Sequence, residues 1–335
     1  MRPLFHPSLV NGRYGDPAVY VDTLFEKRSL MFDLGDIAAL SPRKAHRIDQ
    51  IFVSHTHIDH FVGFDQLLRL LVGREKMVQL HGPAGLAERV YHKLQGYCWD
   101  LVETYACDLV FIVNEFNPPR AATRTQFRLK TGFAPEPAPA NMARDGALHS
   151  EPTFRVSAAM LEHHTSCLGF ALQEAAHVNI WKNRLLERGL PVGAWLKSLK
   201  SAVAEGRSDD HPIHVAGPAG ASPRVEPLGS LRDVLTVTPG QKIGYVTDVA
   251  DTPANRAAII ALVAHADILF IEAAFVQGDA ALARERAHLT TTAAGEIARA
   301  AGVRRIEPFH FSPRYVGEEE RLLREMMAAF EELHG

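Results

Sequence analysis

Short apolar runs that end in polar clusters recur along the chain and predict the strands of an α/β fold. Residues 18–33 contain two apolar bursts around the charged turn 26–28, which indicates a hairpin. Residues 51–53 read as a buried strand, and residues 61–72 carry apolar side chains at helical spacing. Further strands are predicted at 78–81, 154–160, 168–172, 242–247, 268–271 and 304–307, and further helices at 84–94, 253–264, 293–301 and 318–333.

Two segments depart from this pattern. Residues 114–152 are rich in proline with interleaved arginine and lysine, which predicts loop with at most one short strand at 126–130. Such a loop is either a solvated insertion or a basic segment that touches phosphates. Residues 174–232 are polar and loop-rich, with a predicted helix at 195–203. Their excess of Lys and Arg suits an arm for an anionic polymer, and surface decoration is the alternative.

Composition narrows the class of protein. The 335 residues are 47% hydrophobic and 22% charged, typical of a soluble globular protein of one large domain or two. The formal net charge of −3 excludes an overall basic field, so a nucleic acid must be held by a local basic patch. We expect neither a membrane span nor a secretory signal, and hence a cytoplasmic protein. Cys98, Cys107 and Cys167 lack Cys-x-x-Cys spacing and are expected to be buried thiols.

The polar cluster after residues 51–53 is the first candidate for chemistry. His55 and His57 are two positions apart, so their rings can share one metal ion, and Asp59 with His60 can reach a second. Imidazole nitrogen with carboxylate oxygen suits zinc, and open positions for water make such a site catalytic. A solvated histidine-rich loop is the alternative.

Later strand ends supply further candidates. His163 and His164 follow one predicted strand, and either can be a third ligand of the first ion. Asp248 follows another strand and can bridge two ions. Asp33 and Asp36 can accept hydrogen bonds from metal-ligating histidines, or they are ordinary turn carboxylates.

The order of these residues resembles the metallo-β-lactamase superfamily, and most closely ribonuclease Z, the endonuclease family that trims precursor tRNA 3′ ends. The likeness rests on the segments 51–85, 162–170, 185–199, 286–290 and 310–315. It implies a four-layer αβ/βα sandwich of two mixed sheets flanked by helices. It also implies a single domain over residues 1–335, with insertions at 114–152 and 174–232, the second resembling a tRNA-binding arm.

The resemblance also implies the roles of single residues. It assigns seven metal ligands, which are His55, His57, Asp59, His60, His163, Asp248 and His310. His55, His57 and His163 would hold one ion, Asp59, His60 and His310 the other, and Asp248 would bridge them. Asp59, His288 and Glu272 are the implied catalytic residues, and Ser312 and Arg314 the implied phosphate contacts. The implied cofactor is a pair of Zn²⁺ ions, for which manganese or iron could substitute. The implied partners are precursor tRNA and a second copy of the chain.

Some positions depart from the family pattern. The glycine before the bridging aspartate is Thr247, residues 249–250 are Val-Ala, residues 271–274 are Ile-Glu-Ala-Ala, and a different loop occupies 11–16. These changes spare the ligands but alter the rim of the pocket, so they bear on the substrate. A dinuclear hydrolase of small phosphodiesters or other esters is therefore an alternative, and a non-catalytic RNA-binding protein is a third.

Overall fold

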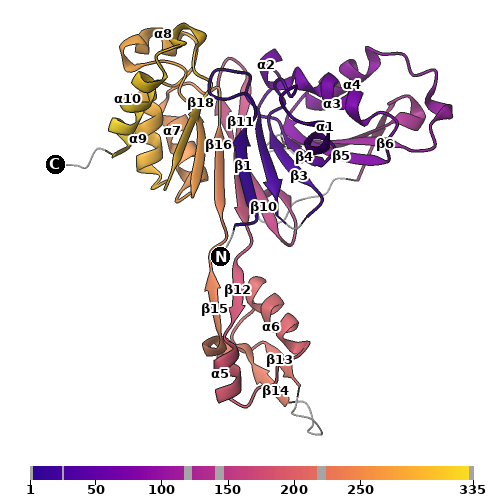
Figure 1. Cartoon of the computed structure of the whole chain (residues 1–335), viewed down its shortest axis with the longest axis vertical. Helices are drawn as coiled ribbons and strands as arrows, with labels where there is room; N and C mark the ends of the chain where they lie inside the picture. The colour runs from indigo at the N-terminus through magenta and orange to yellow at the C-terminus, as the bar shows by residue number, and fades with distance from the viewer. Residues whose placement is uncertain (1–2, 25, 117–122, 140–146, 217–223, 332–335) are drawn as a thin grey trace. The chain divides into compact units, whose positions relative to one another are not determined.

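The computed structural model describes residues 3–24, 26–116, 123–139, 147–216 and 224–331. Contacts divide the chain into two compact units. Unit 1 comprises residues 1–173 and 242–335, and unit 2 comprises residues 174–241 (Figure 1). In the described residues, no helix is both long and apolar enough to cross a membrane.

Unit 1 contains a mixed eight-stranded sheet whose strands follow one another in chain order. Its strands are β1 (Phe5–Leu9), β2 (Val19–Thr23), β3 (Ser29–Phe32), β4 (Ile48–Phe52), β5 (Lys76–Pro83), β6 (Leu109–Phe116), β7 (Thr123–Arg128) and β8 (Pro135–Pro137). β3 to β6 run parallel, and the outer strands pair antiparallel. The predicted hairpin is confirmed, because β2 pairs antiparallel with β3.

The second sheet of unit 1 has six strands and is also mixed. In spatial order they are β18 (Ile306–Phe309), β17 (Ile268–Glu272), β16 (Lys242–Val246), β11 (Ser166–Glu174), β10 (Phe154–Glu162) and β9 (Ala147–Ser150). β16, β17 and β18 run parallel, whereas β11 pairs antiparallel with β16. The polar segments after β16 and β18 therefore leave the same edge of the sheet.

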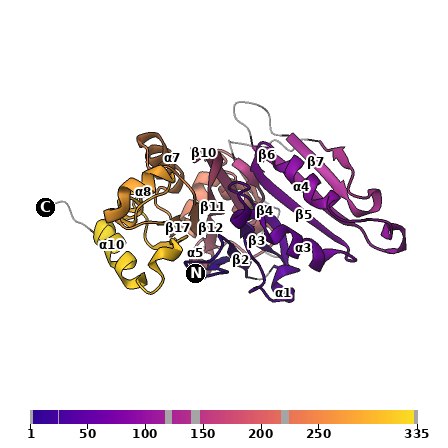
Figure 2. The same ribbon diagram turned by 90° about the horizontal axis from the view of Figure 1, so that it is seen from above.

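The two sheets face each other across an aromatic core. Phe32 and Phe52 of the first sheet pack on Phe170 of the second, and Tyr245 stacks on Phe32 with ring centroids 5.3 Å apart. Helices cover the outer faces (Figure 2). α3 (Gly63–Leu71) and α4 (Leu86–Gln95) pack on the first sheet, while α7 (Pro253–Val263), α9 (Thr291–Ala300) and α10 (Glu319–Glu331) pack on the second. This is the predicted four-layer αβ/βα sandwich.

Local sequence explains where the helices of unit 1 begin. Pro253 is at the first turn of α7, and the Thr252 side chain accepts a hydrogen bond from the Asn255 amide. Thr290 caps α9 in the same way. The remaining helices of unit 1 are short: α1 (Pro42–Ala45), α2 (Ile58–Phe61) and α8 (Ala280–Glu285).

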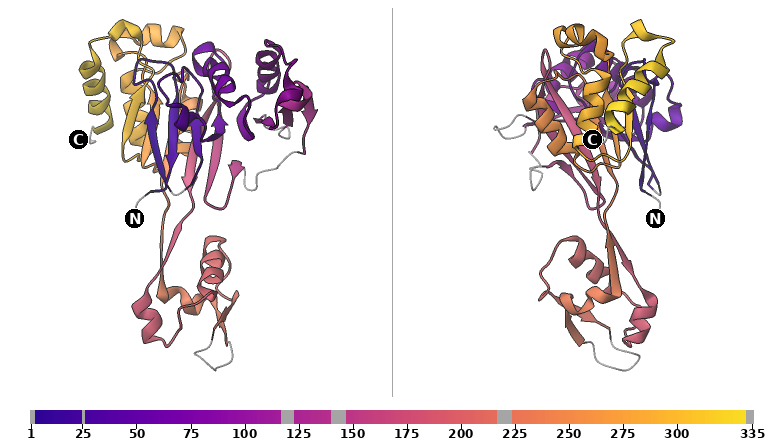
Figure 3. Two further views of the ribbon diagram at one scale, coloured as in Figure 1. Left: turned by 45° about the vertical axis from the view of Figure 1, so that its right-hand side comes forward. Right: turned by 90° about the vertical axis from the view of Figure 1, so that its left-hand side faces the viewer.

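Unit 2 has a hydrophobic core of its own. It contains β12 (His177–Ile180), α5 (Lys182–Glu187), α6 (Trp195–Ala204), β13 (Pro212–Val215), β14 (Arg224–Pro227), a 3-10 helix (Leu228–Val234) and β15 (Leu235–Thr238). Leu185, Trp195, Leu199, Leu228 and Leu231 are buried together. Figure 3 shows the helices and strands of this unit. The predicted helix at 195–203 is confirmed, but the description of 174–232 as loop-rich is wrong.

The prediction that 114–152 is loop with at most one strand is also wrong. β6 extends to residue 116, and β7, β8 and β9 lie within the segment. Prolines mark both ends of β8, which is the outermost strand of its sheet, where a missing N–H is tolerated. Residues 117–122 and 140–146 of this prediction lie outside the described residues.

Candidate metal centre

The predicted ligands leave strand ends of both sheets of unit 1. Residues 54–60 follow β4, and His163 follows β10. Asp248 follows β16, and His310 follows β18. The loops beyond the carboxyl ends of parallel strands are where α/β folds place their chemistry.

Asp248 lies at the centre of the cluster. Its Oδ2 is 3.5 Å from His55 Nε2, 3.4 Å from His60 Nε2 and 3.6 Å from His163 Nε2. Its Oδ1 is 3.0 Å from His310 Nδ1. A single buried carboxylate thus faces four imidazoles from three other segments of the chain.

Two groups of these side chains correspond to the two implied sets of ligands, and a third group, Asp248 and His310 with Glu272 and His288, overlaps both. His55, His57 and His163 with Asp248 have ligand atoms that all lie within 4.8 Å of one another, and so do Asp59, His60 and His310. Asp59 Oδ2 lies 3.3 Å from His310 Nε2 and 3.5 Å from His60 Nε2. The structure therefore brings together all seven residues that the resemblance implied, in the same two sets.

The donor set fits divalent cations. His55 Nε2, His60 Nε2 and His310 Nδ1 are buried and have no hydrogen-bond partner within the described residues. Buried polar atoms are normally paired, so buried nitrogens that face a carboxylate without a hydrogen bond are suited to bind a cation. Mixed imidazole and carboxylate donors suit zinc, manganese or iron.

Neighbouring groups fix the orientation of two of these histidines. His60 Nδ1 donates to Asp33 Oδ2 at 2.8 Å, and Ser54 Oγ and Tyr245 Oη each donate to the same oxygen at 2.7 Å. His163 Nδ1 donates to the Ala287 carbonyl at 2.9 Å. With Nδ1 held in this way, Nε2 of both His60 and His163 faces Asp248. Histidines that bind a metal are commonly oriented by such a hydrogen bond from the other ring nitrogen.

Asp33 has the orienting role that its position suggested, but Asp36 does not. The Asp36 carboxylate accepts hydrogen bonds from Gln66 Nε2 and from the Ala38 amide. Ser54 and Tyr245 were not predicted. Ser54 precedes His55 directly, so its position in the chain could have suggested this role. Tyr245 is a buried residue within a strand, and nothing in the local sequence distinguishes it from other core residues.

Burial and neighbouring charges shift the pKa values of the clustered histidines in opposite directions. Burial and the adjacent His60 lower the pKa of His55 to about 2, so its imidazole is neutral, as a metal ligand must be. Burial alone would lower the pKa of His60, but Asp248 and Asp33 outweigh it and raise the pKa to about 10. Burial opposes the charge of Asp248, yet His310 and His60 hold its pKa well below the ordinary value. The carboxylates of the site thus attract positive charge strongly.

Backbone strain is concentrated at this edge of the sheets. Asp33, Asp248, Ala287 and His310 adopt positive φ angles of 52°, 42°, 53° and 59°. Side chains with a Cβ rarely occupy this region, and each instance costs roughly 1–3 kcal/mol. Such strain is typical of functional sites, where the surrounding structure holds the residue in place.

His288 and Glu272 form a pair beside the cluster. His288 Nδ1 donates to Glu272 Oε2 at 2.9 Å, and Glu272 Oε1 accepts from the Val249 amide at 2.7 Å. Burial opposes the charge of His288, but Glu272 outweighs it and raises the histidine pKa. The structure therefore pairs two of the residues to which the resemblance assigned catalytic roles.

The cluster opens into a pocket of about 560 Å³. His57, Asp59, His288 and Ser312 line it. Arg314 does not line the pocket; its Nη1 lies 3.5 Å from Asp279 Oδ2, and its guanidinium lies over the Tyr315 ring.

Two other lining residues were not predicted. Tyr14 belongs to the divergent loop at 11–16, and its hydroxyl donates to the Tyr315 carbonyl at 2.8 Å. Arg286 lies within a segment that carried the resemblance, but no role was assigned to it.

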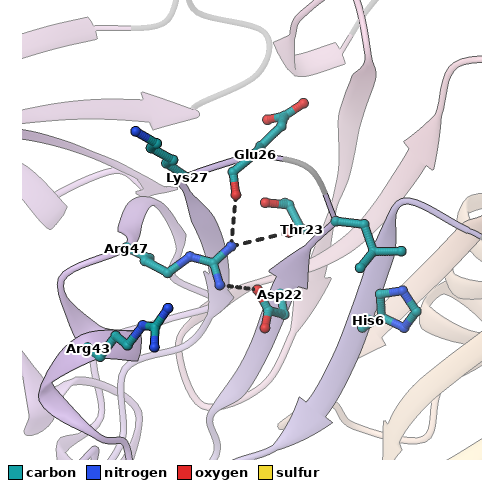
Figure 4. A pocket seen from close by; sticks show the side chains of 8 residues that line it. His6, Asp22, Thr23, Glu26, Lys27, Arg43 and Arg47 are labelled. Atoms are coloured by element: carbon teal, nitrogen blue, oxygen red, sulfur yellow. Dashed lines mark hydrogen bonds and ion pairs between the residues drawn. The ribbon is translucent and has the colours of Figure 1, made fainter.

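A separate hollow lies by the β2–β3 hairpin (Figure 4). Arg47 lines this hollow, and its guanidinium is already bound to other groups of the protein. One Nη lies 2.7 Å from Asp22, and the other donates to the carbonyls of Thr23, Glu26 and Arg28. This hollow is a feature of the hairpin and is not part of the metal centre.

Comparison with known proteins agrees with this geometry. A family model described as a beta-lactamase superfamily domain matches residues 18–179. The metallo-β-lactamase fold protein YhfI from Bacillus subtilis superposes with a TM-score of 0.54 at 16% identity, covering 96% of this chain and 91% of that one. The human short-form tRNase Z superposes with a TM-score of 0.51 at 18% identity, covering 93% and 92%. The fold is thus that of the metallo-β-lactamase proteins.

Sequence similarity identifies the branch of this superfamily. Ribonuclease Z of Deinococcus radiodurans is 30% identical over 305 residues, which cover 90% of this chain and 86% of that protein. Ribonuclease Z of Treponema pallidum is 28% identical over 316 residues, with 91% and 84% covered. The chain belongs to the ribonuclease Z family.

Proposed function

We propose that the chain is a metal-dependent endoribonuclease that removes 3′ trailers from precursor tRNA. The observation that carries the proposal is the convergence of seven histidine and aspartate side chains, Asp248 among them, in a chain that belongs to the ribonuclease Z family. The pocket opens directly onto this cluster, so a phosphodiester can reach it.

Two divalent cations fit the two groups of ligands. We propose that His55, His57 and His163 hold one ion and that Asp59, His60 and His310 hold the other, with Asp248 between them. When bound, such ions lower the pKa of water toward about 7 and neutralise charge on the phosphoryl oxygens. Zinc is the proposed metal, and manganese or iron would accept the same donors.

The chain's own residues handle the protons of the reaction. Asp59 is a partly exposed carboxylate that lines the pocket, and it is placed to accept a hydrogen bond from the attacking water. Water attacks the phosphorus and gives a proton to Asp59, and the bond between the phosphorus and the 3′ oxygen breaks. His288, held by Glu272, donates its proton to that leaving oxygen. The products are a 3′-hydroxyl on the tRNA and a 5′-phosphate on the trailer.

Ser312 is proposed to contact a substrate phosphate, because it lines the pocket. The same role for Arg314 requires its guanidinium to leave Asp279. Its forked donors suit a phosphate as well as they suit the carboxylate.

The test is a cleavage assay with purified protein, a precursor tRNA carrying a 3′ trailer, and bis(p-nitrophenyl) phosphate. We expect a single cut at the base of the trailer, loss of cleavage with a chelator, and recovery with added metal. Hydrolysis of the small ester alone would replace this proposal with a hydrolase of small phosphodiesters, a possibility raised by the altered pocket rim.

Three finer statements belong to the same proposal. The resident metal is zinc, which elemental analysis of the purified protein would identify at two ions per chain. The chain forms a homodimer, which light scattering on a sizing column would detect. A precursor tRNA substrate places the enzyme in the cytoplasm, which fractionation of cells would test.

A further inference from the structure

Arg286 is the strongest feature of the pocket that the proposed mechanism leaves unused. Of the described residues lining the pocket, it is the single Lys or Arg, whereas Asp16, Asp59 and Asp248 are carboxylates. Its side chain is exposed and has no ion pair or hydrogen bond within the described part of the chain. A guanidinium at the mouth of an otherwise acidic pocket is available to an anionic ligand.

The backbone holds Arg286 firmly beside the centre. It caps α8, where its amide donates to the Leu282 carbonyl at 3.0 Å. The next residue, Ala287, has a positive φ and accepts the hydrogen bond from His163 Nδ1. His288 follows and is bonded to Glu272. Arg286 is thus held at its backbone by neighbours that belong to the candidate centre, while its side chain is exposed.

We propose that Arg286 binds a phosphate next to the scissile one and thereby selects a polynucleotide over a small ester. The inference rests on the proposed function. Cations held by the seven candidate ligands would neutralise charge on the scissile phosphate, but the flanking phosphates of an RNA would still need positive charge. Arg314 is paired with Asp279, so Arg286 is the guanidinium that the pocket offers without breaking an existing contact. The fork geometry of arginine suits two phosphate oxygens.

The experiment compares Arg286→Ala, Arg286→Gln and Arg286→Lys with the matched control Arg284→Ala. Arg284 is also exposed and belongs to α8, but it does not line the pocket. The readouts are kcat and KM for precursor tRNA at several KCl concentrations. We expect Arg286→Ala and Arg286→Gln to raise KM about tenfold, as a lost charge-assisted contact predicts. The slope of log(kcat/KM) against log[KCl] should become shallower by about 0.7–1. Arg286→Lys should retain the slope.

A second measurement locates the phosphate. Precursors carrying one neutral methylphosphonate, placed in turn at each linkage beside the cut, are cleaved by the wild type and by Arg286→Gln. At one position the wild type should lose about tenfold in kcat/KM while the variant loses little, because the contact is already absent. Equal losses at every position, or Arg286 variants that match Arg284→Ala, would overturn the assignment. A wild type that cleaves no precursor would instead overturn the proposed function, and this assignment with it.

Discussion

Asp49 shows at the scale of one residue how burial converts into pH-dependent stability. It lies in β4, and its Oδ1 is buried without a hydrogen-bond partner in the described residues. Burial raises its pKa to about 6, although Arg28 and Lys76 act in the opposite direction. Because the folded protein holds this proton more tightly than the unfolded chain does, stability decreases as the pH rises from about 4 to 6.

Replacing Asp49 by Asn should therefore stabilise the protein at pH 7.5 by about 2 kcal/mol, and the gain should disappear below about pH 4. Urea denaturation across this pH range measures the effect. Glu151→Gln is the control, because its effect on the free energy of unfolding should have the opposite sign. A hydrogen bond from His149 and the contact with Arg28 lower the Glu151 pKa to about 2. Its contribution is present at neutral pH and lost as the pH falls. A gain for Asp49→Asn that is independent of pH would contradict the argument.

His288 is predicted to act on the leaving group. His288→Gln should lower kcat for precursor tRNA by roughly 10²- to 10⁴-fold, the usual contribution of a general acid. The loss should be much smaller for bis(p-nitrophenyl) phosphate, because p-nitrophenolate leaves without being protonated. Steady-state kinetics on both substrates make the comparison. An equal loss on the two substrates would argue against proton donation.

Glu272→Gln provides the companion measurement. Glu272 is fully buried and bonds both His288 and the Val249 amide, so it is a positioning residue. The glutamine side chain can still accept the hydrogen bond from the Val249 amide, but it carries no charge and no longer raises the pKa of His288. We expect His288 to lose its proton at a lower pH, so the alkaline limb of the pH–rate profile should move to lower pH. An unshifted profile would show that His288 does not depend on this carboxylate.

At the scale of elements, the β2–β3 hairpin depends on one guanidinium. Arg47 donates hydrogen bonds to three carbonyls of the hairpin and pairs with Asp22. Figure 4 shows its contacts with Thr23, Glu26 and Asp22. Arg47→Ala should lower the free energy of unfolding by about 2 kcal/mol, because those carbonyls lose a charged donor. Urea denaturation tests this.

Arg43→Ala is the matched control for the hairpin. Arg43 lines the same hollow but is exposed and has no side-chain partner within the described residues. We expect a change within about 0.5 kcal/mol, as is usual for surface sites. Equal effects of the two substitutions would assign the loss to charge and not to the carbonyl contacts.

Elements with a strong local signal were predicted well from sequence. The apolar strands leading to His55, Asp248 and His310 were located within one to three residues, because strands buried on both faces are rich in β-branched and apolar residues. The edge strands β8 and β9 were missed, and β7 was anticipated only as a possible short strand at 126–130. Edge strands tolerate proline and charge, so their composition resembles that of a loop.

The ligands were harder to predict than the strands. The residue pattern did not choose between His163 and His164, and the choice came from family resemblance. In the structure His163 Nε2 faces Asp248, whereas His164 lines the pocket. What selects His163 is the carbonyl of Ala287, which is 124 positions away in the chain. Local pattern does not encode such a contact.

At the scale of the whole molecule, the chain divides into a unit with the candidate metal ligands and a unit without them. Among the described residues, the buried core of unit 2 consists of side chains between 185 and 235, and all seven candidate ligands belong to unit 1. Its apolar residues are spaced widely between charged ones, which is why the sequence read as polar and loop-rich. Three lysines of unit 2, Lys182, Lys197 and Lys200, line one hollow and have no ion pair within the described residues.

This division predicts a separable function. Gln173 and Lys242 are paired across β11 and β16, so an Asn-Gly turn can join them when residues 174–241 are removed. The shortened protein should fold and hydrolyse bis(p-nitrophenyl) phosphate within about threefold of the full chain, since the cores of unit 1 are untouched. If unit 2 holds RNA, KM for precursor tRNA should rise tenfold or more.

Replacing Lys182, Lys197 and Lys200 together by Ala refines the test, because unit 2 remains in place. Each lysine that contacts a phosphate contributes about 0.7–0.9 to the salt slope, so the triple variant should lower that slope by up to about 2–3. The matched control is Arg207→Ala, because Arg207 is an exposed cation of unit 2 paired with Glu205. A shortened protein that cleaves precursor tRNA with the KM of the full chain would place RNA recognition in unit 1 alone, where Arg286 is the cation that the pocket presents.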